Sequence, residues 1–269
     1  MNLHLWLAPL ALAAAQARAD DFATEFLQKT YPANAEALAT FHKNQPFAEA
    51  PATCHFRAPT ATGDGAGYCL QLLGDKTVGD RRLLFLSGAN LDVTTALSGY
   101  DELWLFARDG GGWKEIAHGG GASFANSGKG STAVEWLPIG PERWAAVADS
   151  NFSQNGLSQD AKTLYWVAGD GVKTMTLLSG TSDAGAGGCD SSVELNASRC
   201  LDLTGTLAVR RDLPAVAGFY PLEMTLNGST GLPGPGQRVY KAEKFRLDYD
   251  EPAGRYQIPA HYPAELKQE

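Results

Sequence analysis

The chain has 269 residues, and its 22 Lys and Arg against 30 Asp and Glu give a formal net charge of −8. This length suffices for one large domain or two small ones, with a hydrophobic core that needs no metal. Because an acidic chain without a basic block cannot neutralise a row of phosphates, we expect no nucleic-acid partner. Thirty glycines and a charged fraction of 19% are typical of a turn-rich globular protein rather than of a helical bundle.

The first 19 residues have the pattern of a cleaved secretory signal. An apolar stretch (LHLWLAPLALAAA, residues 3–15) precedes the A-x-A site Ala17-Arg18-Ala19, and two aspartates follow. The stretch is too short to cross a bilayer, and no later segment reaches the roughly 20 apolar residues that a transmembrane helix needs. We therefore predict a signal peptide at residues 1–19 and a soluble protein that is periplasmic or secreted.

Residues 20–50 are predicted to form a helical lead-in. Phe22, Phe26 and Leu27 repeat at helical spacing, and Pro32 interrupts the pattern. Apolar residues then resume at the same spacing as far as Phe41. The sequence therefore predicts a short helical segment, broken in the middle, before the main domain.

From residue 51 to residue 263 the hydrophobic pattern has the period of strands, between clusters of Gly, Pro, Asp and Asn. Short Gly-containing connections, such as 109–112 and 169–171, force hairpins. Residues 51–263 are thus predicted to form one all-β, mainly antiparallel domain, and residues 264–269 a frayed tail. The expected strands lie near 68–73, 82–87, 102–108, 113–118, 132–138, 143–148, 163–168, 172–178, 192–196, 200–209, 219–227, 238–249 and 255–258.

Two of the hairpins resemble each other: ELWLFARDGGGWKEIA at residues 102–117 and TLYWVAGDGVKTMTLL at residues 163–178. Internal repetition would favour a propeller of four-stranded blades. Against this, no third clean copy follows, and hairpins of Trp and Leu around an Asp-Gly turn look alike for physical reasons alone. The expected fold is therefore an all-β, hairpin-built sandwich or half-barrel, or else a small propeller, with a short N-terminal helical segment.

Four cysteines agree with export, because an even number in an oxidising compartment is most simply a set of disulfides. Cys54 and Cys69 bracket a turn rich in Pro, Gly and Thr, and Cys189 and Cys200 bracket a polar one. We predict these two local pairs. A zinc site would need closely spaced cysteines or clustered histidines, and the sequence has neither.

Several loose motifs resemble uncharacterised secreted β-rich proteins of Gram-negative bacteria. The resemblance covers most of the chain after the signal, implies a periplasmic location, and implies neither an activity nor any functional residue. Its motifs, in order, are the Trp-bearing hairpin with its Asp-Gly turn, Trp136 to Gly140, Asp149 to Gly156, Gly180 to Cys189, Tyr220-Pro221-Leu222, and Tyr256 with Pro259.

The segment 149–160 has the spacing of a calcium loop. Asp149, Asn151 and Ser153 place oxygen-bearing side chains at alternate positions, Asn155 could supply a backbone ligand, and Asp160 follows as a carboxylate. Polar residues at these positions are also what a hairpin loop uses to satisfy its own backbone. We expect no cofactor, with calcium as the alternative, and metal ligands at Asp149, Asn151, Ser153 and Asp160.

No catalytic residue is assigned from the sequence. The motifs of a Ser nucleophile, a P-loop and a dinucleotide-binding turn are missing. His118, at a strand end before a Gly-rich stretch, is the histidine most favoured for acid–base chemistry. The carboxylates near turns, expected to be solvated strand ends, are Asp101, Glu102, Asp248 and Asp250.

Aromatic residues invite a carbohydrate-binding hypothesis. Four tryptophans fall within expected strands and are predicted to belong to the core: Trp104, Trp136, Trp144 and Trp166. Trp113 and Tyr240 are the better candidates for exposure and for stacking on a sugar.

The function expected first is that of a non-enzymatic periplasmic binding protein that presents loops to a protein partner, such as an inhibitor or immunity protein. A carbohydrate or cell-wall binding module, and a hydrolase of envelope polymers, are the alternatives. The loops concerned are 119–131, 149–160, 180–191 and 228–237. The candidate ligand-binding residues are Trp113, His118, Asp149, Asn151, Gln154 and Asn155.

Overall fold

The structure is a computed structural model. It describes residues 22–44, 52–59, 67–92, 98–124, 128–169, 171–186, 200–231 and 237–267. The predicted signal peptide at residues 1–19 lies outside the described residues. Among the described residues, no helix is long and apolar enough to cross a membrane.

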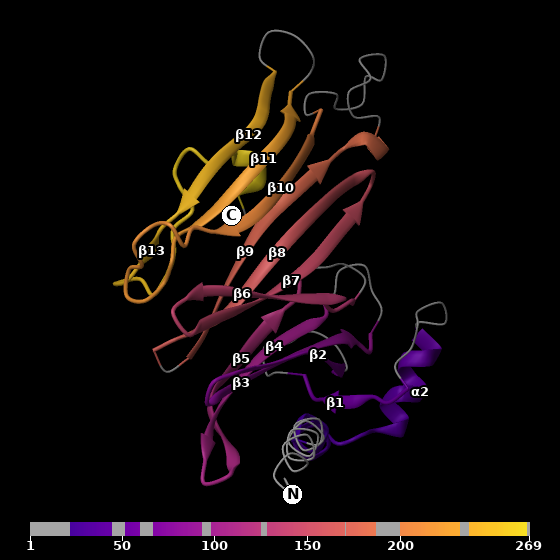
Figure 1. Cartoon of the computed structure of the whole chain (residues 1–269). Coiled ribbons are helices and arrows are strands. Elements are labelled where there is room, and N and C mark those ends of the chain that lie inside the picture. Colours follow the sequence, from indigo (N-terminus) through magenta and orange to yellow (C-terminus); the bar gives the residue numbers. More distant parts are fainter. Residues whose placement is uncertain are drawn as a thin grey trace, which may run out of the picture.

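Two helical segments precede the strands, as the sequence predicts. Residues 22–30 are helical, and helix α2 spans Ala35–Asn44. Pro32 lies in the break, and the side chain of Asn34 accepts a 2.9 Å hydrogen bond from the amide of Ala37, which caps α2. Figure 1 shows these segments beside the first sheet of the molecule.

The first sheet has five strands in sequence order, each antiparallel to its neighbours. Neighbouring strands of the sheet are consecutive in the sequence, and two-residue turns join β2 to β3 and β4 to β5. The shortest, β1, has three residues and was not predicted. The strands are β1 (His55–Arg57), β2 (Tyr68–Val78), β3 (Arg81–Asn90), β4 (Tyr100–Asp109) and β5 (Gly112–Ala122).

The second sheet has seven antiparallel strands, again in sequence order. It is curled, since β10 contacts β6 as well as its hydrogen-bonded neighbours. A separate two-stranded ribbon, β13 (Tyr249–Asp250) with β14 (Arg255–Tyr256), follows it. The strand expected near 192–196 lies outside the described residues. The seven strands are β6 (Ala133–Gly140), β7 (Arg143–Gln154), β8 (Leu157–Ala168), β9 (Gly171–Ser182), β10 (Asp202–Val209), β11 (Leu222–Thr230) and β12 (Arg238–Leu247).

The two sheets stack to form a sandwich. Strand β2 contacts β6, β4 contacts β8, and β5 contacts β9. The apolar layer between them consists of Leu83, Phe85, Leu103, Leu105, Ala146, Ala148 and Tyr165. The expected all-β sandwich or half-barrel is confirmed, and the propeller alternative is not: the described strands form two continuous sheets rather than separate four-stranded blades.

The two similar hairpins, β4–β5 and β8–β9, belong to different sheets and lie against each other in this sandwich. A Cβ added to Gly119 on β5 would lie 3.1 Å from Cβ of Val172 on β9, so the two backbones approach closely. The two similar sequences therefore correspond to two hairpins that face each other across the sandwich, β4–β5 at one edge of its sheet and β8–β9 inside the other.

A second and larger core lies within the curled sheet and is covered by the C-terminal segment. Trp166 contacts Tyr256, and the ring of Phe219 stacks on Tyr249 with centroids 4.0 Å apart. Residues 264–266 form a 3-10 turn, η2 (Ala264–Leu266), whose Leu266 is buried. The frayed tail predicted at 264–269 is therefore wrong for the part that the structure describes, because Leu266 anchors it in this core.

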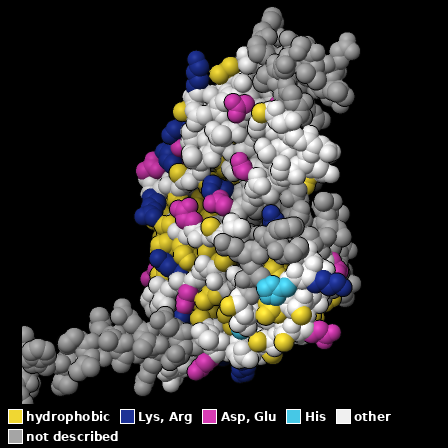
Figure 2. All heavy atoms as spheres, turned by 90° about the vertical axis from the view of Figure 1, so that its right-hand side faces the viewer, with side chains coloured by type: hydrophobic (Ala, Val, Ile, Leu, Met, Phe, Trp, Pro, Cys, Tyr) yellow, Lys and Arg dark blue, Asp and Glu magenta, His cyan; other side chains and the backbone are white. Residues whose placement is uncertain are grey.

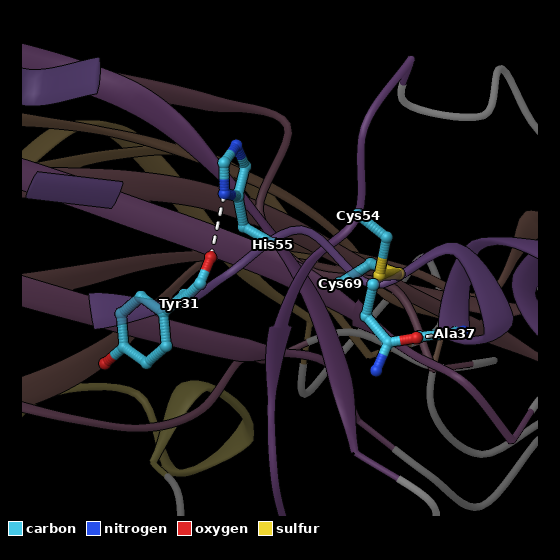
Figure 3. Close-up of a disulfide and its surroundings, with 6 residues drawn as sticks. Tyr31, Ala37, Cys54, His55 and Cys69 are labelled. Atoms are coloured by element: carbon cyan, nitrogen blue, oxygen red, sulfur yellow. Dashed lines mark hydrogen bonds between the residues drawn. A yellow bond between two sulfur atoms is a disulfide. The ribbon is translucent and has the colours of Figure 1, made fainter. Parts of the chain in front are cut away.

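Figure 3 shows the predicted disulfide between Cys54 and Cys69, which ties β2 to the segment after α2. Both cysteines are buried beside Ala37 and Phe41 of α2, so the helix packs against the disulfide. Next to it, Nδ1 of His55 hydrogen-bonds the carbonyl oxygen of Tyr31 at 2.9 Å. Cys200 is also disulfide-bonded, and Cys189, its predicted partner, lies outside the described residues.

Candidate binding groove

Residues 149–160 form a hairpin of two long strands, not the loop that was expected. Strands β7 and β8 pair without interruption from Ala145 to Gln154. Asn155 and Gly156 at the tip have positive φ angles of 51° and 81°, as a two-residue hairpin turn requires. The Asn-Gly pair is a signal for this turn that was available in the sequence.

The hairpin brings four polar side chains to one face of the seven-stranded sheet. Asp149 lies directly opposite Lys162, and Asn151 lies directly opposite Asp160. Because side chains alternate along a strand, these two neighbouring pairs point to the same side. Residues thirteen and nine positions apart in the sequence are thus neighbours.

This face is hollowed into a polar groove with a volume of about 580 Å³. A smaller hollow of about 190 Å³ adjoins it at Lys162 and is lined by residues of β6, β7, β8 and β10. The mouth of a curled β-sheet is a common place for ligands. The polar groove is lined by Lys129, Gly130, Thr132, Asp149, Ser150, Asn151, Asp160, Ala161, Lys162, Ser179, Thr204 and Gly205.

The charges in the polar groove differ in how they are balanced. Nζ of Lys162 lies 2.6 Å from a carboxylate oxygen of Asp149, forming an ion pair. Asp160 receives only a long 3.4 Å hydrogen bond from the amide of Asn151. Neither Asp160 nor Lys129 forms an ion pair with another described residue. Each of these two side chains is therefore exposed without a fixed counter-charge among the described residues.

The position of Asp160 depends on a glycine across the strand pair. A Cβ on Gly180 would lie 2.9 Å from Oδ2 of Asp160, closer than real Cβ contacts allow. The carboxylate therefore lies over a bare stretch of β9 backbone. This leaves the sheet surface beside Asp160 accessible to a ligand.

One wall of the polar groove is held by a buried carboxylate. Asp101 on β4 is fully buried and accepts hydrogen bonds from Oγ of Ser131 at 2.6 Å and from the amide of Ser131 at 3.3 Å. The hydroxyl of Tyr165 on β8 also donates to it, at 3.2 Å. Burial raises the pKa of Asp101, and the hydrogen bonds from Ser131 partly oppose this. Asp101 thus ties the wall segment 128–132 to both sheets.

The next residue, Glu102, is buried on the opposite face of β4. It accepts a 2.6 Å hydrogen bond from Tyr31 and another from the indole of Trp104, and Arg57 lies 3.2 Å from it. Arg57 also covers the ring of Tyr100 at 3.8 Å. Burial, and secondarily the charge of Glu102, raise the pKa of Tyr31. This network attaches the N-terminal helical segment to the sheet.

The expectation that Asp101 and Glu102 are solvated strand ends is therefore wrong. Adjacent residues of a strand point to opposite faces, and here both faces are covered. For the same reason the two carboxylates cannot act together across a cleft, as a glycoside hydrolase would need.

Two of the predicted ligand-binding residues lie on the other sheet. The ring of His118 on β5 stacks on Trp104 at a centroid distance of 4.0 Å, and its Nδ1 lies 2.8 Å from Glu115. Trp113 is half-buried between Phe22 and the guanidinium of Arg108. Neither lines the polar groove.

The other predicted site residues lie at different places along the β7–β8 hairpin. Asp149, Asn151 and Asp160 line the polar groove, whereas Gln154 and Asn155 lie at the exposed tip. Ser153 pairs with Ser158 near that tip. The set proposed for calcium is therefore spread along two strands, with Asp149 engaged by Lys162, and the described residues include no cluster of three His, Cys, Asp or Glu that could hold a metal.

The aromatic residues are mostly internal. Trp104 and Trp166 are buried as expected, and Trp136 and Trp144 are half-buried. Tyr240, predicted to be exposed, is only 2% exposed. A bulge in β12 at Ala242, which has a φ of 53°, shifts the alternation so that Tyr240 packs near Phe245. No aromatic side chain lines the described polar groove.

The polar groove presents hydroxyl groups beside its charged side chains. Its hydroxyl groups come from Ser150, Ser179, Thr132 and Thr204, and none of them is hydrogen-bonded to a described histidine that could activate it. Carboxylate, ammonium, amide and hydroxyl groups together offer donors and acceptors on a rigid surface.

Comparison with other proteins finds no relative. No protein-family model matches the chain, and no match is found among curated proteins or among solved structures. The function is therefore inferred from the geometry of the polar groove.

Proposed function

We propose that the protein is a non-enzymatic binding protein that holds a segment of a protein partner in the polar groove. The observation that carries this proposal is the pair of opposite charges, Asp160 and Lys129, which lack an ion-pair partner among the described residues. A polypeptide segment with side chains of both signs would satisfy both.

The rigidity of the polar groove supports recognition without catalysis. Asp149, Asn151, Asp160 and Lys162 all stand on paired strands, so little conformational entropy is lost when a partner binds. The wall segment with Lys129 is fixed by the buried Asp101. The groove also unites parts of two segments expected to contact a partner, 119–131 and 149–160.

A polypeptide is favoured over a carbohydrate because the lining has no aromatic ring on which a sugar could stack. Charges of both signs are also characteristic of protein surfaces. Figure 2 shows the same mixture on one face of this molecule, where basic and acidic side chains are interspersed with hydrophobic ones.

We further propose that binding takes place in the periplasm or outside the cell. The disulfide between Cys54 and Cys69 supports an oxidising compartment, and the signal-like sequence at residues 1–19 agrees with it.

The test is affinity capture followed by a binding measurement. Residues 20–269, with disulfides intact, are immobilised and exposed to envelope extract at moderate salt. A protein retained in stoichiometric amount is then purified and titrated against Asp160→Asn and Lys129→Gln variants. We expect each variant to weaken binding by about tenfold or more, as the loss of a buried interfacial charge contact does.

Matched controls are Asp109→Asn and Lys114→Gln, which change exposed charges on the five-stranded sheet. They should leave the affinity unchanged. Equal effects of groove and control variants, or retention of glycan fragments in place of any protein, would contradict the proposal.

A further inference from the structure

A second hollow lies between the two sheets, at the opposite ends of β7 and β8 from the polar groove. This inter-sheet cleft has a volume of about 420 Å³, within the roughly 300–1,000 Å³ of small-molecule sites. It opens where the turns after β2, β6 and β8 meet. Its lining residues are Val78, Asp80, Arg81, Leu83, Leu105, Ala107, Ile116, Glu142, Arg143, Trp144, Val167 and Gly169.

The inner wall of the inter-sheet cleft is aliphatic. Leu83 and Leu105 belong to the apolar layer between the sheets, and Val167 packs against the same layer. At the mouth, Ile116 is 53% exposed and adds an aliphatic side chain to the surface. It occupies a bulge of β5 between the pairs Leu105–Ala117 and Phe106–Glu115. The cleft therefore continues the core outward to the surface.

The rim of the inter-sheet cleft is charged. It carries the guanidinium groups of Arg81 and Arg143 and the carboxylates of Asp80 and Glu142. Nζ of Lys76, which is not among the lining residues, lies 4.3 Å above the ring of Trp144. The lining itself therefore carries two cationic and two anionic groups.

An aliphatic inner wall beside an exposed arginine that has no ion pair with a described residue suits an amphiphile with an anionic head group. We infer that the inter-sheet cleft binds a free fatty acid, with the alkyl chain between Leu83, Leu105 and Val167 and the carboxylate beside Arg81. Arg81 is the suitable partner because it is exposed and forms no ion pair with a described residue. Arg143 is already engaged, with its guanidinium 4.5 Å from the ring of Phe219.

The experiment is a calorimetric titration of residues 20–269 with octanoate, decanoate and dodecanoate below their micelle concentrations. Each added methylene that enters the inter-sheet cleft should tighten binding about fourfold. Dodecanol, which lacks the charge, should bind more weakly than dodecanoate by about three- to fivefold.

Three variants locate the site. Ala107→Trp fills the cleft and should abolish binding, and Ile116→Ser removes part of the apolar mouth from an exposed position that does not affect folding. Arg81→Gln should reduce the affinity for dodecanoate to that for dodecanol. The matched control Arg211→Gln changes an exposed arginine that does not line the cleft, and it should have no effect.

Affinity that does not depend on chain length, or that survives both Ala107→Trp and Ile116→Ser, would overturn the inference. So would equal losses in Arg81→Gln and Arg211→Gln. Lys129→Gln in the polar groove should not change dodecanoate binding, so the failure of either proposal is visible separately.

Discussion

At the scale of single residues, the molecule depends on two neighbouring carboxylates that are buried on opposite sides of one strand. Asp101 joins the wall of the polar groove to both sheets, and Glu102 holds the N-terminal segment through Tyr31 and Arg57. Each is hydrogen-bonded at several points, as a buried charge must be.

Asp101→Ala should lower the free energy of unfolding by about 2–3 kcal/mol, since it leaves the hydroxyls of Ser131 and Tyr165 without an acceptor inside the protein. Urea denaturation monitored by tryptophan fluorescence measures the change. A loss below 0.5 kcal/mol would show that Asp101 does not hold the wall segment.

The pH dependence of stability follows from the raised pKa of Asp101. Between the ordinary value of 3.8 and the raised value, the folded state binds more protons than the unfolded state, so the contribution of Asp101 to stability decreases as the pH rises. Asp101→Asn cannot titrate. The stability of the wild type relative to Asp101→Asn should therefore fall through this window and then stay constant, and an opposite slope would contradict the assignment.

Arg57→Met should destabilise the protein by about 3 kcal/mol, because it leaves the carboxylate of Glu102 buried without its cation. The double variant Arg57→Met with Glu102→Gln should recover part of this loss. Thermal and urea unfolding of the single and double variants test the coupling between Arg57 and Glu102. Additive losses in the free energy of unfolding would contradict this coupling.

At the scale of elements, the β7–β8 hairpin gives the polar groove its shape. Its two strands are polar on both sides near the tip, and the register is fixed by the Asn155-Gly156 turn. A slip of one residue would move Asp149 and Asp160 to the other face of the sheet.

Gly156→Ala should therefore lower the free energy of unfolding by about 1 kcal/mol, because Gly156 has a φ of 81° that alanine adopts poorly. Gly121→Ala on β5 is the matched control, since Gly121 lacks a positive φ and its added Cβ would meet nothing within 4 Å. Comparison of the unfolding curves of the two variants tests whether the turn requires a glycine at position 156. Equal changes in the free energy of unfolding would contradict this requirement.

At the scale of the whole molecule, the antiparallel all-β class and most strand positions could be predicted from the sequence, because buried strands carry clear apolar runs and Asp-Gly turns. The choice between a sandwich and a propeller could not, because it depends on how the hairpins pack rather than on their local patterns. The strands β7 and β8 could not be predicted at their polar ends, because strands that are exposed on both faces lack the alternation of apolar and polar residues. The contact between Arg57 and Glu102 spans 45 residues and leaves no local pattern. Tyr240 was predicted to be exposed, and this is wrong because the bulge at Ala242 changes which side of β12 its side chain faces.

Each sheet of the sandwich is continuous in sequence, β1 to β5 and then β6 to β12. Among the described strands, the chain therefore passes from one layer to the other once, between β5 and β6. The wall of the polar groove, residues 128–132, lies on this crossing and is tied to both layers through Asp101. A change that moves the two layers apart would therefore also move one wall of the polar groove away from the other.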